Sequence, residues 1–277
     1  MLEPLDISTK YYFWKPYAAY FKAFELKAYR DFTSFPNDGR ILDLGCSDGT
    51  FAQMLKELLE FKTQLIGVDY DENQVQCAAQ KKFLYSQVLQ LDASNLTFQD
   101  ESFDAVFANQ VLHCLGSGSD STTPEKVIKE VSRILKKDGM FMFTVATDLA
   151  DRHVCVAEFL KNIGLSSLAN FYRQKWRQRG LFVSTFSREQ WLDLLKENGL
   201  SIQNAVPFIS ADINYRWSLL SIYPLLFMKI FKIIPLKQVH NLVAKIMKQL
   251  MISSYNRQAT TIPPEDGHYI LVIAKKS

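Results

Sequence analysis

The sequence lacks the patterns typical of small secreted, zinc-binding or membrane-spanning proteins. It has four cysteines in 277 residues and none in a C-x-x-C pair, so neither a disulfide framework nor a metal site is indicated. No apolar run reaches the about 20 residues that a membrane-spanning helix needs. The first residues, MLEPLDISTKYYFW, carry acids where a signal peptide carries basic residues. These absences predict a cytoplasmic protein without a bound metal.

The composition is that of a globular protein with an uneven distribution of charge. Apolar residues make up 48% of the chain and charged residues 22%, which excludes a disordered protein. The segment 41–145 carries nine basic and fifteen acidic side chains, whereas 146–277 carries seventeen basic and nine acidic ones. The basic second half is either a set of solvated helix faces or a surface that meets an anionic partner.

Short apolar runs alternate with helical periods along the chain. The pattern predicts strands at 40–44, 65–68, 87–91, 103–108, 140–145, 200–210 and 268–275, and helices at 51–59, 71–82, 124–135 and 188–198. This alternation predicts an α/β fold with a doubly wound, mostly parallel seven-stranded sheet. Right-handed crossovers place the carboxyl ends of the parallel strands at one edge, where such sheets bind their ligands.

The stretch ILDLGCSDGT (41–50) allows two interpretations. Gly45–Gly49 matches G-x-S-x-G, the nucleophile elbow of serine hydrolases, with Ser47 as nucleophile. The same stretch also leads from a strand through a glycine loop into a helix, as nucleotide-binding turns do. The elbow interpretation lacks an upstream oxyanion loop, and the stretch follows the first strand rather than several. Asp69, 20 residues after Gly49, suits a pair of ribose hydroxyls, which favours a nucleoside-type ligand.

Four segments in order resemble the motifs of class I S-adenosylmethionine-dependent methyltransferases. DLGCSDG (43–49) resembles the first motif, with Ser47 in place of the middle glycine, and VDYD (68–71) resembles the acidic second motif. The segments 91–115 and 127–145 resemble the later motifs of the ubiquinone/menaquinone-methyltransferase-like branch. The resemblance covers about residues 35–145 and implies a Rossmann-like fold, S-adenosylmethionine as cofactor, and methyl transfer.

The resemblance implies that the glycine loop holds the methionine part of the cofactor. In this chain the loop residues are Gly45, Cys46, Ser47 and Gly49, and the missing side chains of the two glycines let the backbone approach the ligand. Asp43 is expected to orient the loop and to help hold the amino end of the cofactor.

The resemblance also assigns residues at the next strand ends to the nucleoside. Asp69 is expected to bind the ribose and Tyr70 to pack on the adenine. Asp92 is expected to accept from the adenine amino group beside the Ala93 backbone, and Asn109 to lie near the sulfonium. An alternative is that an aspartate at a strand end only caps the next helix.

Methyl transfer from a sulfonium is an in-line displacement, so alignment of the reactants can supply most of the rate. His113 is the best-placed candidate for a general base, and Tyr215 and His153 are weaker ones. The chain has no [DN]-P-P-[YF] motif, which is typical of nucleic-acid amino methylation. The basic run YRQKWRQR (172–179) suits either RNA binding or a surface helix, and we expect no nucleic-acid partner.

The expected organisation has four parts. Residues 1–34 form an N-terminal helical lid in which Tyr12 contacts the cofactor, and 35–150 form the cofactor-binding core. Residues 151–186 form a helical cap, and 187–277 complete the core around an apolar helical insertion at about 212–260.

The insertion is the main pointer to the acceptor. WSLLSIYPLLFM (217–228) has no charge, and 239–251 repeats apolar residues at helical spacing. These helices form a lid, an apolar substrate pocket, a peripheral membrane contact or a homodimer contact. We therefore expect a small hydrophobic or lipid-linked acceptor, as in small-molecule biosynthesis. The alternative is a non-catalytic assembly factor that binds the cofactor.

Overall fold

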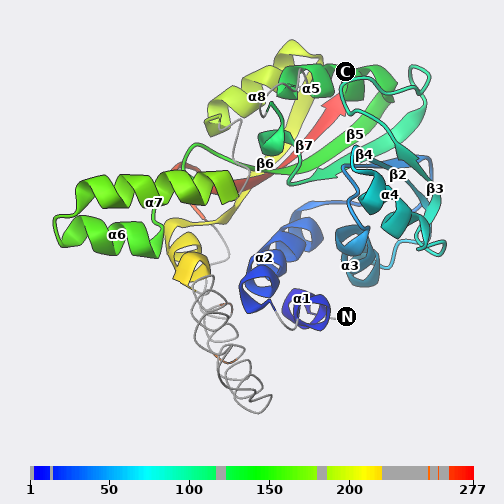
Figure 1. Ribbon diagram of the computed structural model, residues 1–277. Helices are drawn as coiled ribbons and strands as arrows, with labels where there is room; N and C mark the ends of the chain where they lie inside the picture. The colour runs from blue at the N-terminus through cyan, green and yellow to red at the C-terminus, as the bar shows by residue number, and fades with distance from the viewer. Residues whose placement is uncertain are drawn as a thin grey trace.

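The computed structural model describes residues 3–12, 15–116, 123–179, 186–219 and 262–277, together with residues 249 and 255 (Figure 1). Its centre is a seven-stranded sheet of order β3-β2-β1-β4-β5-β7-β6. The strands are β1 (Ile41–Leu44), β2 (Leu65–Asp69), β3 (Tyr85–Gln90), β4 (Phe103–Asn109), β5 (Leu135–Ala146), β6 (Leu200–Ile209) and β7 (Tyr269–Lys276). The first five run parallel, and β7 is antiparallel to both β5 and β6. The predicted α/β fold with a mostly parallel seven-stranded sheet is confirmed.

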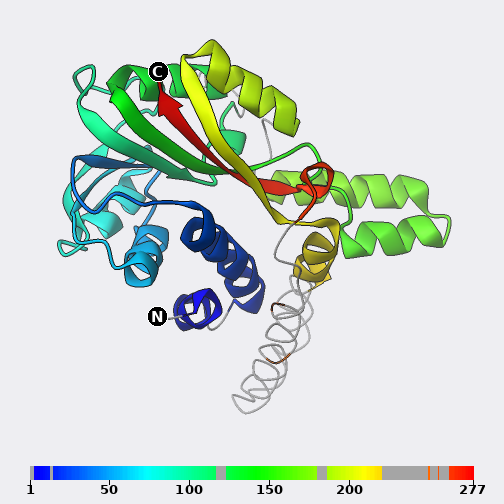
Figure 2. The same ribbon diagram turned by 180° about the vertical axis from the view of Figure 1, so that it is seen from behind.

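Helices cover both faces of this sheet. They are α1 (Pro4–Tyr11), α2 (Pro16–Phe32), α3 (Thr50–Leu59), α4 (Glu72–Ala79), α5 (Pro124–Ile134), α6 (Cys155–Asn162), α7 (Ser166–Arg179) and α8 (Arg188–Glu197), with short 3-10 turns at Leu112–Cys114 and Pro264–Asp266. Both views show α1, α2 and α3 on one side of the sheet and α5 and α8 on the other (Figures 1 and 2). Each side has its own apolar core.

Local sequence signals explain where the helices begin. Thr123 accepts a hydrogen bond from the Lys126 N–H, and Pro124 occupies the first turn of α5. Ser187 and Gln190 form the predicted capping box of α8. Trp191 in α8 lies fully buried against the sheet, and its indole N–H donates to the Ala146 carbonyl. These signals bring α5 and α8 onto the same face.

Several boundaries differ from the prediction by a few residues, and the largest difference lies where α5 meets β5. The helix α5 ends at Ile134 and β5 begins at Leu135, so Lys136 and Lys137 lie in the strand rather than in the last helical turn. The pairing of β4 with β5 shifts register between Phe103 and Ala105, and Asp138 adopts a left-handed φ of 61° there. The irregular start of β5 therefore occupies the residues that the sequence assigned to a helix end and a turn.

Two helices stand away from the sheet. α6 and α7 form an antiparallel pair at the side of the molecule, which we call the projecting hairpin (residues 155–179; Figures 1 and 2). It lies within the predicted cap segment 151–186. The predicted apolar helices at 217–228 and 239–251 lie outside the described residues, apart from 217–219 and 249. Within the described ranges, no helix is long and apolar enough to cross a membrane.

Candidate functional site

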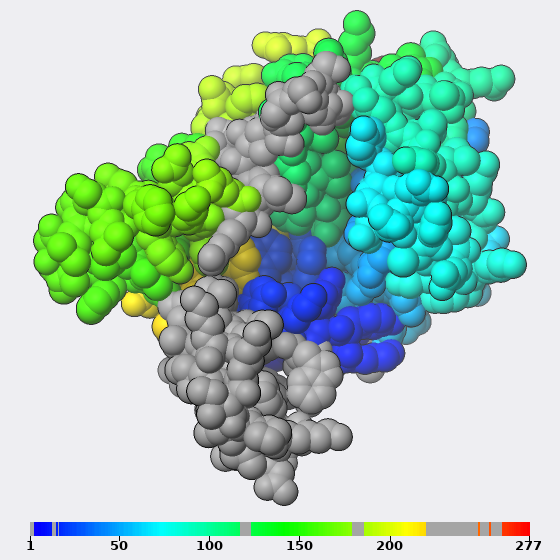
Figure 3. Space-filling model, in the orientation of Figure 1, coloured from blue at the N-terminus to red at the C-terminus, as the bar shows by residue number. Residues whose placement is uncertain are grey.

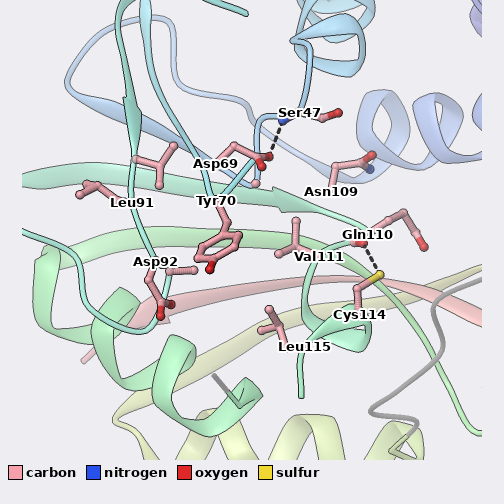
Figure 4. A pocket seen from close by; sticks show the side chains of 13 residues that line it. Ser47, Asp69, Tyr70, Leu91, Asp92, Asn109, Gln110, Val111, Cys114 and Leu115 are labelled. Carbon is pink, nitrogen blue, oxygen red and sulfur yellow. Dashed lines mark hydrogen bonds between the residues drawn. The ribbon is translucent and has the colours of Figure 1, made fainter. Parts of the chain in front are cut away.

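A cavity of about 400 Å³ opens at the carboxyl ends of β1, β2, β3 and β4. We call it the strand-end site. Its walls consist of Gly45, Ser47, Val68, Asp69, Tyr70, Leu91, Asp92, Ala93, Asn109, Gln110, Val111, Cys114 and Leu115 (Figure 4). The sheet order reverses between β1 and β4, so the cavity lies at the topological switch point where open α/β sheets bind ligands.

The glycine loop after β1 needs its two glycines for different contacts. Gly45 has φ 73°, and a Cβ there would lie 2.3 Å from Val111 Cγ2. Gly49 has φ 76°, and a Cβ there would lie 2.8 Å from the Tyr85 ring. The N–H groups of Gly45 and Cys46 both donate to the Val68 carbonyl, which ties the loop to β2. The loop therefore presents backbone rather than side chain to the cavity.

Asp69 joins the first two strand ends. One carboxylate oxygen accepts from the Ser47 N–H at 2.8 Å, and the other accepts from the Asp71 N–H at 3.0 Å. Tyr70, beside it, is 78% exposed and lies along the cavity wall (Figure 4). Asp71, not Asp69, caps α4, because its side chain accepts from two N–H groups of that helix. Asp71 therefore caps the helix, and Asp69 lines the cavity.

Asp92 and Ala93 line the cavity after β3. The Asp92 carboxylate accepts from both the N–H and the hydroxyl of Ser94, each at 2.8 Å. These bonds fix the turn that follows the strand and leave the carboxylate beside Leu91 and Tyr70 in the cavity wall. Asp92 therefore both stabilises the local turn and forms part of the cavity wall.

Asp43 lies beneath the loop rather than in the cavity wall. Its side chain is 3% exposed and accepts from the Tyr85 hydroxyl at 2.5 Å. Burial raises the pKa of Asp43 to about 7; the bond from Tyr85 opposes this rise, and the nearby Asp69 adds to it. The Cys46 side chain is buried as well. Both residues support the loop from below.

A buried carboxylate from α2 meets the end of β4. Glu25 is fully buried and accepts from Lys22 Nζ, Asn109 Nδ2, Gln110 Nε2 and the Thr144 hydroxyl, at 2.6 to 2.9 Å. Lys22 also donates to Asn109 Oδ1 at 2.8 Å. Asn109 is thus held in the cavity wall by both members of an ion pair from the N-terminal helices.

No sequence motif indicated a site role for Glu25, Lys22, Gln110, Thr144 or Tyr85. The sequence held one signal for Lys22 and Glu25, since opposite charges three residues apart in a helix lie on the same face and can form an ion pair. Gln110 follows β4 directly and has a left-handed φ of 58°. A glutamine gives no sequence signal for such a backbone angle, which glycine or asparagine would have suggested. Tyr85 is recognised only once β3 lies beside β2 and Asp43 lies on the next strand.

His113 does not suit the predicted role of general base. It is 2% exposed, and its Nδ1 accepts from the Ala146 N–H at 3.3 Å. Burial, with a smaller contribution from the nearby Lys22, lowers the pKa of His113 to about 3, so its imidazole is a weak base. The structure places it behind the cavity wall, between Val111 and Cys114 of that wall.

The other predicted side chains lie elsewhere. Tyr12 is half-buried outside the cavity wall, where burial and the nearby Asp48 and Glu25 raise its pKa to about 12. Tyr215 is 41% exposed in the helical segment 211–219, also outside the wall. His153 contacts His268, with 2.9 Å between Nδ1 and Nε2. None of the three joins the strand-end site.

The geometry gives no support to a serine hydrolase. The Ser47 hydroxyl donates to Gln74 Oε1 at 3.0 Å and not to a histidine. A nucleophile needs a base within hydrogen-bond reach. Ser47 instead contributes its backbone N–H to Asp69 and its position in the cavity wall.

Part of the chain is similar in sequence to known methyltransferases. Residues 42–143 match the family model described as methyltransferase domain. The chain is 35% identical over 107 residues to a malonyl-[acyl-carrier protein] O-methyltransferase of Legionella pneumophila, which covers 38% of this chain and 35% of that protein. It is 34% identical over 117 residues to a putative methyltransferase of Bacillus subtilis, covering 40% and 44%. The matched segment spans about a third of the length of the first curated relatives.

Solved structures share the fold over most of the chain. A putative methyltransferase from Bacillus halodurans aligns with TM-score 0.51 and 17% identity, covering 91% of this chain and 98% of that one. Geranyl diphosphate C-methyltransferase from Streptomyces coelicolor aligns with TM-score 0.55 and 14% identity, covering 94% and 78%. At these identities the likeness concerns the fold alone.

Proposed function

We propose that this chain, in which residues 42–143 form a class I S-adenosylmethionine-dependent methyltransferase domain, catalyses methyl transfer to a small acceptor. The observation that carries the proposal is the strand-end site, in which the glycine loop, Asp69 and Asp92 line one cavity at the switch point. The sequence resemblance assigns these positions to the cofactor, and here they line one cavity of fitting size.

The cavity fits the cofactor in size and in the order of its polar groups. Its volume of about 400 Å³ falls within the roughly 300–1,000 Å³ usual for ligand pockets. The glycine loop leaves its backbone bare at Gly45, which suits the methionine part. Asp69 suits the ribose hydroxyls, and Tyr70, Leu91 and Asp92 supply an apolar face and an acceptor for the adenine.

The cofactor supplies an electrophilic methyl group on its sulfonium. The chain's own residues then have to fix that group opposite the acceptor and exclude water. Asn109, held by Glu25 and Lys22, is the polar side chain at the β4 end of the wall, and Val111 and Leu115 form apolar surface next to it. Alignment of this kind is worth roughly 7–11 kcal/mol and needs no general base.

The acceptor is the less defined part of the proposal. Its expected hydrophobic or lipid-linked character follows from the apolar sequence of the 212–260 insertion. The proposed assignment to the ubiquinone/menaquinone-like branch follows from the sequence motifs at 91–115 and 127–145. One relative supports a carrier-bound acceptor by its name, which is malonyl-[acyl-carrier protein] O-methyltransferase. The four-part organisation, with α1 and α2 as a lid, also belongs to this proposal.

Calorimetric titration with S-adenosylhomocysteine tests the cofactor assignment. The wild-type chain is expected to bind it, and Asp69→Ala is expected to bind at least about 100-fold more weakly, because two charge-assisted hydrogen bonds of about 1.5–3 kcal/mol each are lost. Asp71→Ala is the matched control, since it removes a neighbouring carboxylate that caps α4. Equal affinity of wild type and Asp69→Ala contradicts the assignment.

Labelled methyl transfer separates an enzyme from a cofactor-binding assembly factor. The chain is incubated with methyl-labelled S-adenosylmethionine and a cell extract, and the label is followed into the small-molecule, lipid and nucleic-acid fractions. Label in the organic-soluble fraction is expected. Binding of the cofactor without any labelled product favours the assembly factor. Ser47→Ala is expected to retain activity, and its loss with intact cofactor binding would favour the hydrolase.

A further inference from the structure

The projecting hairpin exposes an unusual amount of apolar surface. Among the described residues, ten large apolar side chains are classed as exposed, and five of them fall between positions 159 and 171. The exposed fractions lie between 48% and 62% for Phe159, Ile163, Leu165, Leu168 and Phe171. Soluble surfaces scatter such residues singly, so a group of five on one motif indicates a contact surface.

The position of the group is equally specific. Ile163 and Leu165 flank Gly164 in the turn that joins the two helices, and Gly164 has φ 81° with open space around it. Phe159 lies one turn before Ile163 on α6, and Leu168 lies one turn after Leu165 at the start of α7. The apolar side chains therefore gather at the free end of the hairpin, which stands clear of the body in the space-filling view (Figure 3).

Basic side chains accompany the apolar tip. The described basic side chains of the hairpin are Lys161, Arg173, Lys175 and Arg177, against one acid, Glu158. Arg173 pairs with Glu158 and Arg177 pairs with Asp151, while Lys175 lies over the Phe171 ring at 5.7 Å. An exposed apolar tip with a surplus of positive charge is the combination that binds the surface of an anionic bilayer.

We propose that the tip of the projecting hairpin inserts into the headgroup region of an anionic lipid bilayer. Ile163, Leu165 and Leu168 enter the acyl boundary, and Lys161 and Lys175 meet the phosphates. The proposal does not depend on the methyl-transfer activity, and it gives the chain access to acceptors that reside in a membrane.

Two other partners fit the hairpin less well. Pairing with a second copy of this chain would bring two positively charged hairpins together, and their mutual repulsion opposes a contact at the tip. Single-stranded RNA is bound by stacking on aromatic faces, but Tyr172 and Trp176 are partly buried and pack inward on Val154, Ala157 and Ala169. Phe159 and Phe171 are exposed aromatic rings, but Ile163, Leu165 and Leu168 between them are aliphatic and offer no stacking face.

Vesicle co-sedimentation of the full chain tests the proposal. The probes are vesicles of phosphatidylcholine with phosphatidylglycerol and vesicles of phosphatidylcholine alone. Binding is expected on the anionic vesicles and is expected to weaken as salt is added. Ile163→Ser with Leu168→Ser is expected to lower the partition coefficient at least about tenfold, since the two substitutions remove apolar side chains from the inserted tip.

Controls separate the tip from general stickiness. Phe83→Ser removes an exposed apolar side chain far from the hairpin in sequence and is expected to sediment like wild type. Lys161→Gln with Lys175→Gln is expected to weaken binding to anionic vesicles only. All variants are expected to bind S-adenosylhomocysteine like wild type, which keeps this test apart from that of the proposed function.

Three outcomes overturn the proposal. The first is sedimentation with neither vesicle, and the second is equal sedimentation of wild type and Ile163→Ser/Leu168→Ser. The third is a lipid-free dimer, or binding of a single-stranded RNA oligonucleotide, that the same double substitution abolishes. In that case the tip binds a second copy or a nucleic acid instead.

Discussion

The strand-end site and the projecting hairpin differ in how their surface side chains are held. In the strand-end site the carboxylate and amide side chains are hydrogen-bonded to backbone or to other side chains, as Asp69 is to Ser47 and Asp71, and Asn109 is to Glu25. In the hairpin five large apolar side chains expose 48% to 62% of their surface, beside exposed polar and basic side chains. A site that must hold one ligand geometry needs such fixed groups, whereas a surface that meets a fluid partner does not.

The difference should appear most strongly at Glu25. Replacing it with alanine leaves the Lys22 ammonium and three other donors without their shared acceptor, so Glu25→Ala should lower the free energy of unfolding by about 3–5 kcal/mol. Urea denaturation measures the loss. Glu57→Ala, which removes a carboxylate paired with the exposed Lys10, should cost below about 1 kcal/mol. Equal losses would mean that the buried network carries no special weight.

Gly45 should give the next largest effect. Gly45→Ala forces a Cβ to within 2.3 Å of Val111 Cγ2 at a left-handed φ, so Val111 has to move into the cavity. We expect a loss of roughly 2–4 kcal/mol in stability and at least tenfold weaker binding of S-adenosylhomocysteine, measured by denaturation and calorimetry. Val111→Ala in the same chain should restore part of both. No restoration would assign the damage to the backbone angle alone.

Asp43 should make the free energy of unfolding depend on pH. Its folded pKa of about 7 lies above the ordinary 3.8, so the stability it contributes is present at low pH and is lost as pH rises toward 7, at roughly 1.4 kcal/mol per pH unit. His113, with its pKa lowered from 6.5 to about 3, contributes the opposite slope, since its stability is lost as pH falls below 6.5.

Between about pH 4 and 6.5 these two slopes offset each other. Asp43→Asn removes the first and keeps an acceptor for the Tyr85 hydroxyl. Its free energy of unfolding should therefore rise with pH relative to wild type, by roughly 1.4 kcal/mol per pH unit. Denaturant titrations without cofactor at several pH values measure this difference. Parallel curves for the two proteins would show that Asp43 is ionised in the fold.

The hairpin should give the smallest effect on the folded chain. Phe159→Ser removes a side chain that is 62% exposed, so stability should change by no more than about 0.5 kcal/mol. Affinity for S-adenosylhomocysteine should stay within about twofold of wild type. Thermal denaturation and calorimetry measure both. A loss of stability as large as that of Gly45→Ala would remove the contrast between the two regions.

The strands and their order at the cavity were predictable because the motifs follow one another at fixed places in a βα repeat. Asp69, Asp92 and Asn109 lie where the alternation placed them, each at or just past a strand end. Glu25 and Tyr85 were not predictable, because each acquires its role only from a partner far along the chain. The burial of His113 was not predictable, because spacing from Asn109 gives distance along the chain but not burial.

The place of β7 in the sheet affects how the chain can fold during synthesis. In the described sheet β6 pairs with β7 alone, and β7 also completes the free edge of β5. Until the ribosome has released Tyr269–Lys276, β5 presents an open edge and β6 has no neighbour. The nascent chain can therefore assemble β1 to β5 early, but it must shield that edge from other chains until the last strand arrives.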